Sequence, residues 1–253
     1  MSFYKIIVSY DGTDFSGWQI QPTAPTVSSC LADTFKAIFD QPITLVGASR
    51  TDSGVHALAQ VARFSANVPL PDHELMTVLN RRLPKSVFIR SLETMPDYFH
   101  PCTGVTQKTY HYVLFYRRPL PFIARFGWYY DFIHRVDMEK FQKGLALYQG
   151  EHDFASFCKI EQDDISSIRT IDAITIKKLP HFGAIMVTIT GKSFLRFQIR
   201  RMIGYALDVA RRSDLTVDYI TYMLENPNPE QTLVKAESSG LCLRKVLYEH
   251  THQ

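Results

Sequence analysis

The sequence predicts an α+β protein with two β-α-β-β-α-β halves, ferredoxin-like or RRM-like, whose mainly antiparallel sheets flank a central cleft. Strand-like and helix-like hydrophobic patterns follow one another in this order twice along the 253 residues. Hydrophobic residues make up 45% of the chain and charged residues 21%, which is typical of globular domains. Because no low-complexity linker separates the two rounds, we place the boundary near residue 105, between halves 1–104 and 105–253.

In the first half, residues 4–10 place the apolar side chains of Tyr4, Ile6, Val8 and Tyr10 on one face, as a half-buried strand does. Thr26 is the expected N-cap of a helix, because apolar residues recur after it at helical spacing. That apolar stripe consists of Val27, Leu31, Phe35 and Ile38. The half is completed by strands at 43–46 and 60–64 around a glycine-bearing loop, a helix over about 72–82 and a strand at 87–92.

The second half repeats the pattern with one additional helix. Its first strand, 108–116, alternates Tyr110, Tyr112, Leu114 and Tyr116 on one face. Asp137 is expected to cap the next helix, whose inner stripe is Met138, Phe141, Leu145 and Tyr148. The remaining elements are strands at 171–177 and 184–190 with Pro180 between them, a long helix over 195–212, the additional helix near 217–225 and a last strand at 241–248.

Composition excludes several classes of protein. The longest apolar run, residues 112–116, is far shorter than the roughly 20 residues that a membrane-spanning helix needs, and no secretory signal opens the chain. The four cysteines (Cys30, Cys102, Cys158 and Cys242) are widely spaced, as reduced cytosolic thiols are, and no His/Cys cluster has metal-ligand spacing. We therefore expect a soluble cytoplasmic protein without a metal.

Charge is concentrated in one segment although the net charge is only +3. Within 192–212, six cations accompany the single acid Asp208, and Arg196, Arg200 and Arg211 fall along one flank of the expected helix. Such a stripe is typical either of a solvated helix face or of a surface that contacts a phosphate backbone. Charge alone leaves both interpretations open.

The most unusual segment is the loop 47–57, which reads GASRTDSGVHA. Its glycines permit positive φ and close approach of another chain segment, and Arg50 stands two residues before Asp52. Taken alone, this pattern also fits a surface turn with a local ion pair worth about 0–1 kcal/mol.

The loop resembles the GRTDxGVHA signature of the tRNA pseudouridine synthase A (TruA) family. Other segments resemble motifs of that family and occur in the family's order. The first reads YDGTDFSGWQ, close to the family's YDGxxFxGWQ. The complete set of matching segments is 10–19, 47–57, 60–64, 99–100, 108–112, 150–154, 193–195, 198–204 and 240–243.

The resemblance implies an isomerase that converts uridine to pseudouridine at positions 38, 39 and 40 in the anticodon stem-loop of tRNA. The bond between ribose C1′ and uracil N1 breaks, the base turns, and C5 is joined to C1′. No small-molecule cofactor is implied, and the chain has neither a G-x-G-x-x-G nor a Walker A motif. The family also implies a homodimer that shares its active cleft between subunits.

By the same match, Asp52 corresponds to the catalytic aspartate, Arg200 to its cationic partner and Tyr110 to a tyrosine that stacks on the target uracil. An ionised carboxylate can act as a covalent nucleophile, and a cation keeps the pKa of a buried carboxyl low. The tyrosine hydroxyl could relay the proton from C5. The sequence leaves open whether Asp52 attacks C6 of the ring or C1′ of the sugar, or assists glycal formation.

The match suggests further residues for substrate binding. Arg50 would displace the target base from its stack, and Leu241 would line the base pocket, although a strand leucine is also ordinary core. The candidates for phosphate contacts are Lys192, Arg196, Arg201, Arg211 and Arg212.

The chain departs from the family pattern at Ser49 (usually Gly), Cys102 (usually Arg), Arg201 (often Asn) and Ser28 (often Gln). Ser49 should therefore avoid positive φ or be strained. Two other functions are compatible with parts of the sequence. A noncatalytic RNA-binding protein would not need Asp52, Tyr110 and Arg200 together, yet all three are present. A carboxylate-dependent hydrolase would need a second carboxylate as general acid, and nothing besides their presence supports Asp11 or Asp153 in that role.

Overall fold

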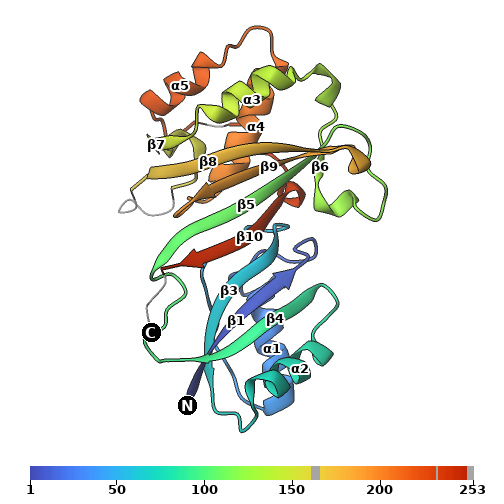
Figure 1. Cartoon of the computed structure of the whole chain (residues 1–253), viewed down its shortest axis with the longest axis vertical. Coiled ribbons are helices and arrows are strands. Elements are labelled where there is room, and N and C mark those ends of the chain that lie inside the picture. The colour runs from blue at the N-terminus through green and yellow to red at the C-terminus, as the bar shows by residue number, and fades with distance from the viewer. Residues whose placement is uncertain (161–165, 232, 250–253) are drawn as a thin grey trace. The chain divides into compact units, whose positions relative to one another are not determined.

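The computed structural model describes residues 1–160, 166–231 and 233–249, and the chain divides into two units (Figure 1). The first unit contains Met1–Thr106 together with the described residues from Cys242 onward, and the second contains Gln107–Leu241. The described residues form an α+β fold with five α-helices and ten strands, and most strand pairs are antiparallel.

In the first unit, β1 lies between β4 and β3, and both β2 and β10 pair with β3. These pairs are antiparallel except for β10, which runs parallel to β3 through the pairs Cys242–His56 and Leu243–Ala57. This pairing groups the last strand with the first unit. Helices α1 and α2 pack against each other, and α2 lies along β4 (Figure 1). The elements are β1 (Ser2–Tyr10), α1 (Val27–Phe39), β2 (Val46–Gly47), β3 (His56–Ala66), α2 (Asp72–Arg82), β4 (Val87–Met95) and β10 (Leu241–Tyr248).

Local sequence explains these elements well. The four inward residues predicted for β1 are all buried. Thr26 caps α1 as predicted: the backbone N–H of Ser29 donates to Thr26 Oγ1, and the N–H of Thr26 donates to Ser29 Oγ, both at 3.1 Å. The strand predicted at 43–46 is wrong, because pairing is confined to Val46–Gly47. Pro42, just before the predicted strand, lacks the N–H that a strand ladder uses.

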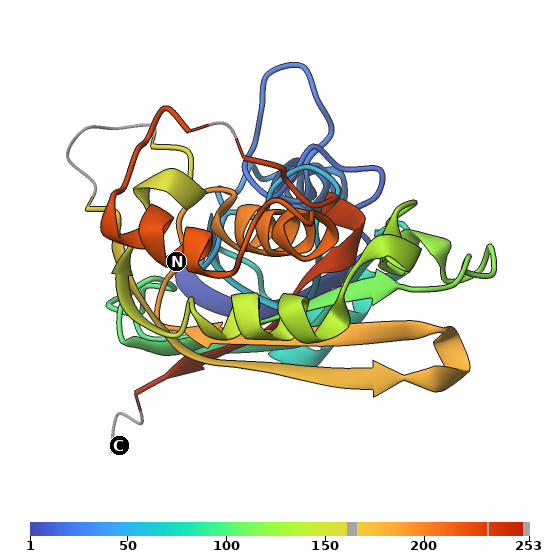
Figure 2. The same ribbon diagram turned by 90° about the horizontal axis from the view of Figure 1, so that it is seen from above.

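In the second unit, the strand order is β5-β9-β8-β7, all antiparallel, and the short β6 lies parallel to β5. Figure 2 shows α3, α4 and α5 on one face of the β8–β9 hairpin. The elements are β5 (Val105–Phe115), β6 (Trp128–Tyr129), α3 (Met138–Ala146), β7 (Gly150–Asp153), β8 (Ile168–Leu179), β9 (Ala184–Gly191), α4 (Gln198–Arg211) and α5 (Asp218–Glu225). Short 3₁₀ turns occur at Ala124–Phe126, Ile133–Arg135, Ala155–Phe157, Pro180–Phe182 and Ser238–Gly240.

The predicted N-cap of α3 is confirmed, since Asp137 Oδ1 accepts from the backbone N–H groups of Glu139 and Lys140 at 2.9 and 3.0 Å. The long helix predicted over 195–212 starts later, at Gln198. Phe197 precedes it with φ 63° and ψ 0°, a left-handed conformation that leaves Arg196 outside the helix. Every described helix is too short or too polar to cross a bilayer.

Candidate active site

In the first unit, Asp52 opens a tight turn between β2 and β3. The backbone N–H of Val55 donates to the carbonyl of Asp52 at 3.1 Å, and Gly54 takes φ 77° at the third position, where type II turns require positive φ. Asp52 is half-buried between the buried Thr51 and the exposed Ser53. Arg50, two residues earlier, is exposed.

A second segment, residues 11–18, packs against this turn and forms hydrogen bonds with its backbone. Trp18 donates its backbone N–H to the carbonyl of Thr51 at 3.1 Å, and Gly54 donates to the carbonyl of Phe15 at 3.1 Å. A Cβ on Gly12 would lie 2.0 Å from the carbonyl oxygen of Val55. The contact is therefore backbone against backbone, which explains why this segment and the Asp52 loop both carry glycines.

Gly17 shows the same close approach with a second constraint. Its φ is 95°, and a Cβ there would lie 2.6 Å from the carbonyl oxygen of Thr51. Both the conformation and the space admit only glycine.

Buried polar contacts fix the first half of the loop, before Asp52. The hydroxyl groups of Tyr10 and Thr51 are hydrogen-bonded at 2.7 Å. The buried Gln60 side chain accepts from the N–H of Ser49 at 3.2 Å and donates to its carbonyl at 2.5 Å. The expectation for Ser49 is confirmed, because the described non-glycine residues with positive φ are Asp40 and Phe197. Cys102 lies nearby, with Sγ 3.5 Å from the carbonyl oxygen of Gly47.

His56, at the start of β3, connects the loop to the 11–18 segment. Its Nδ1 lies 3.0 Å from the N–H of Gly12 and 3.2 Å from Asp11 Oδ1. A single ring nitrogen cannot accept from one group and donate to the other at once. The buried N–H of Gly12 needs an acceptor, whereas Asp11 Oδ1 already accepts from the N–H and hydroxyl of Thr13 at 3.1 and 2.6 Å. We therefore assign Nδ1 as the acceptor.

In the second unit, β5 carries Tyr110. This buried ring meets Phe194 edge to face, with centroids 5.1 Å apart and an interplanar angle of 80°. Two residues along the strand, the fully buried Tyr112 donates its hydroxyl to the carbonyl of Glu237 at 2.9 Å. Burial raises the pKa of Tyr112 well above its ordinary value. Tyr112 is thus part of the core, whereas Tyr116 is exposed because β5 ends at Phe115.

Arg200, in the first turns of α4, is buried and held by the segment around Ala236. Its Nε donates to the carbonyl of Ala236 at 2.9 Å, and the N–H of Ala236 donates to the carbonyl of Arg200 at 3.0 Å. This segment can lie against α4 only because residue 204 is glycine. A Cβ on Gly204 would meet the carbonyl oxygen of Val234 at 2.3 Å.

Three cations lie close to the ring of Phe197. The charged centres of Lys235, Arg196 and Arg200 lie 4.2, 4.8 and 5.7 Å from its centroid. Its left-handed backbone is unusual for a bulky residue and turns the chain into α4. The sequence pattern did not single out Phe197, Lys235, Phe194 or His56 as site residues. Only the last two lie in motifs that could have indicated them.

The other predicted residues fall into distinct environments. Lys192 and Arg196 are exposed, and Leu241 is buried at the start of β10. A guanidinium nitrogen of Arg201 donates to the carbonyl of Cys158, and burial lowers the pKa of Arg201 from its ordinary value.

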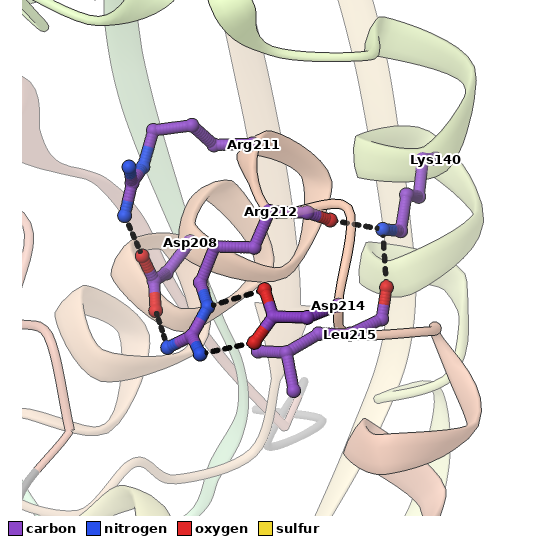
Figure 3. A network of polar contacts seen from close by, with 6 residues as sticks. All are labelled: Lys140, Asp208, Arg211, Arg212, Asp214 and Leu215. Atoms are coloured by element: carbon purple, nitrogen blue, oxygen red, sulfur yellow. Dashed lines mark hydrogen bonds and ion pairs between the residues drawn. The ribbon is translucent and has the colours of Figure 1, made fainter.

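Arg211 and Arg212 are neutralised by neighbouring carboxylates (Figure 3). Arg211 Nη2 lies 2.6 Å from Asp208 Oδ1, and Arg212 bonds both oxygens of Asp214 at 3.1 and 2.5 Å. Lys140 anchors the same corner by donating to the carbonyls of Arg212 and Leu215. The hydrogen bond to Arg212 lowers the pKa of Asp214 from its ordinary value. These two arginines are therefore weaker candidates for phosphate contact than Lys192.

Within residues 1–160, 166–231 and 233–249, the His, Cys, Asp and Glu side chains form no group of three that could hold a metal ion.

Comparison with known proteins identifies relatives of this chain. A family model described as tRNA pseudouridine synthase matches residues 6–103 and 145–249, which include Asp52 and Arg200 but not Tyr110. The tRNA pseudouridine synthase A of Thermodesulfovibrio yellowstonii is 32% identical over 254 residues, covering 96% of this chain and 98% of its own. That of Thermosipho africanus is 33% identical over 249 residues, covering 98% and 100%.

Among solved structures, the alignment with one chain of a Cbf5-Nop10-Gar1 complex covers 95% of this chain and 48% of that chain. Its TM-score is 0.38 and its sequence identity 11%, and these values are too low to support a family assignment. The sequence relatives are sufficient, and the resemblance found in the motifs is confirmed. Because the family model matches most of the residues and the relatives align almost end to end, the chain belongs to the tRNA pseudouridine synthase family, isomerases that act on uridine in tRNA.

Proposed function

We propose that this enzyme isomerises uridine to pseudouridine at positions 38, 39 and 40 in the anticodon stem-loop of tRNA, with Asp52, Tyr110 and Arg200 as its catalytic residues. The observation that carries the proposal is the 47–57 loop, in which the signature aspartate opens a turn held by two glycines of a second family-like segment. The net change leaves the atoms of the nucleoside unaltered: C1′–N1 breaks, C1′–C5 forms, and the proton lost from C5 is balanced by one gained at N1.

Asp52 is proposed as the nucleophile. A carboxylate requires no prior deprotonation at neutral pH, and its backbone here is fixed by hydrogen bonds on both sides, so little reorganisation is needed on attack. Arg200 is proposed as the cation that keeps this carboxylate ionised when the base enters. Its Nε is committed to Ala236, which orients the rest of the guanidinium.

Tyr110 is proposed to stack on the target uracil and to relay the C5 proton through its hydroxyl, with Leu241 lining the base pocket. Base–aromatic stacking contributes about 1–3 kcal/mol per base. Arg50 is exposed at the loop, and we propose that it fills the position vacated by the extruded base, since extrusion costs a few kcal/mol. Lys192 and Arg196 are proposed to contact phosphates, with smaller contributions from Arg201, Arg211 and Arg212.

At the level of the whole chain, we propose two ferredoxin-like halves, 1–104 and 105–253, around a cleft that accepts the RNA. The strand order β4-β1-β3-β2 in the first unit supports this interpretation for that half. We also propose a cytoplasmic homodimer, which rests on the family resemblance.

The test is site-specific mapping of pseudouridine in unmodified tRNA incubated with the purified protein, without added metal or nucleotide. We expect product at positions 38–40. Asp52→Ala should abolish turnover and leave tRNA binding nearly unchanged, because the nucleophile is lost but the basic surfaces are not.

Asp14→Ala is the matched control. Asp14 is an exposed carboxylate in the neighbouring 11–18 segment, so the variant removes the same charge without touching the turn. Turnover by Asp52→Ala at the wild-type rate would overturn the catalytic assignment. Product found only outside the anticodon arm would overturn the proposed substrate position.

A further inference from the structure

The outer end of the β8–β9 hairpin carries exposed cationic and aromatic side chains that have no role in the proposed reaction. Figure 2 shows this turn projecting past the end of α3. We define the hairpin tip as six exposed residues from this turn and from the chain just after β5: Arg117, Arg118, Lys177, Lys178, His181 and Phe182.

Backbone hydrogen bonds join these two segments into one surface. The N–H groups of Tyr116 and Arg117 both donate to the carbonyl of Gly183, at 2.9 and 3.2 Å. Gly183 has φ 59°, and a Cβ there would lie 3.0 Å from Cβ of Arg117, so the two chains are in close contact. Lys178 of β8 pairs with Ile185 of β9, and Ile185 pairs in turn with Leu114 of β5. The backbone of Lys178 therefore lies two strand spacings, about 10 Å, from β5.

No described carboxylate pairs with the lysines and arginines of the hairpin tip. Residues 98–130 and 173–207, which include β5, β9 and the tip, contain no Asp or Glu but four and six lysines or arginines, respectively. Among the described residues, the lysines and arginines of the hairpin tip form no ion pair. They differ in this from Arg211 and Arg212, which face Asp208 and Asp214.

The tip lies far along the strands from Tyr110. Tyr110 pairs with Ile189, and Phe115, at the end of β5, pairs with Ala184. Five residue steps separate these pairs, or roughly 17 Å at the rise of an antiparallel strand. Stacked nucleotides rise about 3.4 Å each, so this distance corresponds to about five nucleotides of one strand.

We propose that the hairpin tip binds the phosphate backbone of the same tRNA outside its anticodon loop, as a second contact that distinguishes a complete tRNA from an isolated stem-loop. The proposal rests on the proposed function, because it assumes that the target uridine lies at the Tyr110 end. A polyanion complements four uncompensated cations, and the exposed ring of Phe182 can stack on an unpaired base.

The experiment measures affinity for full-length unmodified tRNA and for the isolated anticodon stem-loop, as a function of salt. We expect the double variant Arg117→Gln/Arg118→Gln to bind full-length tRNA about tenfold more weakly near 0.1 M salt, with a salt slope smaller by about one or two. Its affinity for the stem-loop should stay within twofold of wild type. Lys177→Gln/Lys178→Gln should give the same contrast from the other strand.

Arg81→Gln/Arg82→Gln is the control, because it removes two exposed cations from the last turn of α2 in the first unit. It should change both affinities less than twofold. Equal losses for both RNAs, or no loss for either, would overturn the proposal. So would a change of oligomeric state in sedimentation, which would identify the hairpin tip as a contact with a second copy. Mapping on the wild-type enzyme separates this result from the proposed function: product outside positions 38–40 contradicts the latter, whatever the tip variants bind.

Discussion

At the residue scale, Asp52, the candidate nucleophile, is placed by contacts to the residues on either side of it. Gly12 and Gly17 bring their backbone against Val55 and Thr51, and the hydroxyl of Tyr10 bonds that of Thr51. Each contact acts on the residues flanking Asp52 rather than on its carboxylate. The position of the carboxylate therefore depends on the absence of side chains at Gly12 and Gly17.

Gly17→Ala tests this dependence. The substituted residue would have φ 95° and a Cβ 2.6 Å from the carbonyl oxygen of Thr51, so strain and overpacking together should lower the free energy of unfolding by about 2–6 kcal/mol. Gly104→Ala is the control, because Gly104 has φ 69° but nothing within 4 Å of its Cβ position. Urea denaturation should show a smaller loss of about 1–2 kcal/mol there. Equal losses would show that packing against the loop contributes nothing.

The cysteines should react in an order set by burial. Burial raises the pKa of Cys242 to about 12 and raises the pKa values of Cys30 and Cys158 as well, which lowers their thiolate fractions at pH 8. Cys102 is exposed. Limiting iodoacetamide at pH 8 should therefore label Cys102 first, as checked by peptide mass spectrometry. Faster labelling of Cys242 in the folded protein would contradict the packing of β10.

At the element scale, α4 holds Arg200 on the face that accepts the 234–236 segment, because Gly204 follows Arg200 by one helical turn. Helix propensity alone predicts that Gly204→Ala stabilises α4 by about 1 kcal/mol. The Cβ would meet backbone atoms at 2.3 to 2.9 Å, and overpacking of this kind costs about 1–3 kcal/mol. We expect a net loss in thermal denaturation, together with a lower kcat as Ala236 moves. A gain in Tm would show that the segment is not packed on the helix.

Arg200→Lys keeps the charge of α4 but loses the planar fork and the Nε donor to Ala236. A charge-assisted hydrogen bond is worth about 1.5–3 kcal/mol, so kcat should fall roughly 10- to 100-fold while tRNA affinity is kept. Single-turnover kinetics at saturating enzyme measure this step. Near-normal turnover would show that Arg200 does not support the reaction.

At the scale of the whole molecule, charge pairing rather than charge number decides which cations remain available to RNA. Lys192→Gln should reduce the salt slope of tRNA binding by about one, because this exposed cation is proposed to release a counterion on binding. Arg212→Gln should reduce the slope much less, because Arg212 already bonds Asp214. Filter binding over a range of salt concentrations compares the two variants, and equal slopes would contradict this distinction.

Family, fold class, helix caps and the alternating core of β1 were all accessible from the sequence, because they depend on neighbours along the chain: hydrophobic period, capping side chains and contiguous motifs. The left-handed backbone of Phe197, the contact of its ring with Lys235 and the approach of Val234 to Gly204 were not. Each of these depends on where the chain returns in space, and residues distant in the sequence meet only once the sheets and helices have packed. The sequence by itself determined the family and indicated the candidate residues for its chemistry. Tertiary structure decided that Lys235 reaches the ring of Phe197 and that Gly204 must stay small, because cation–π contact and steric exclusion act through space.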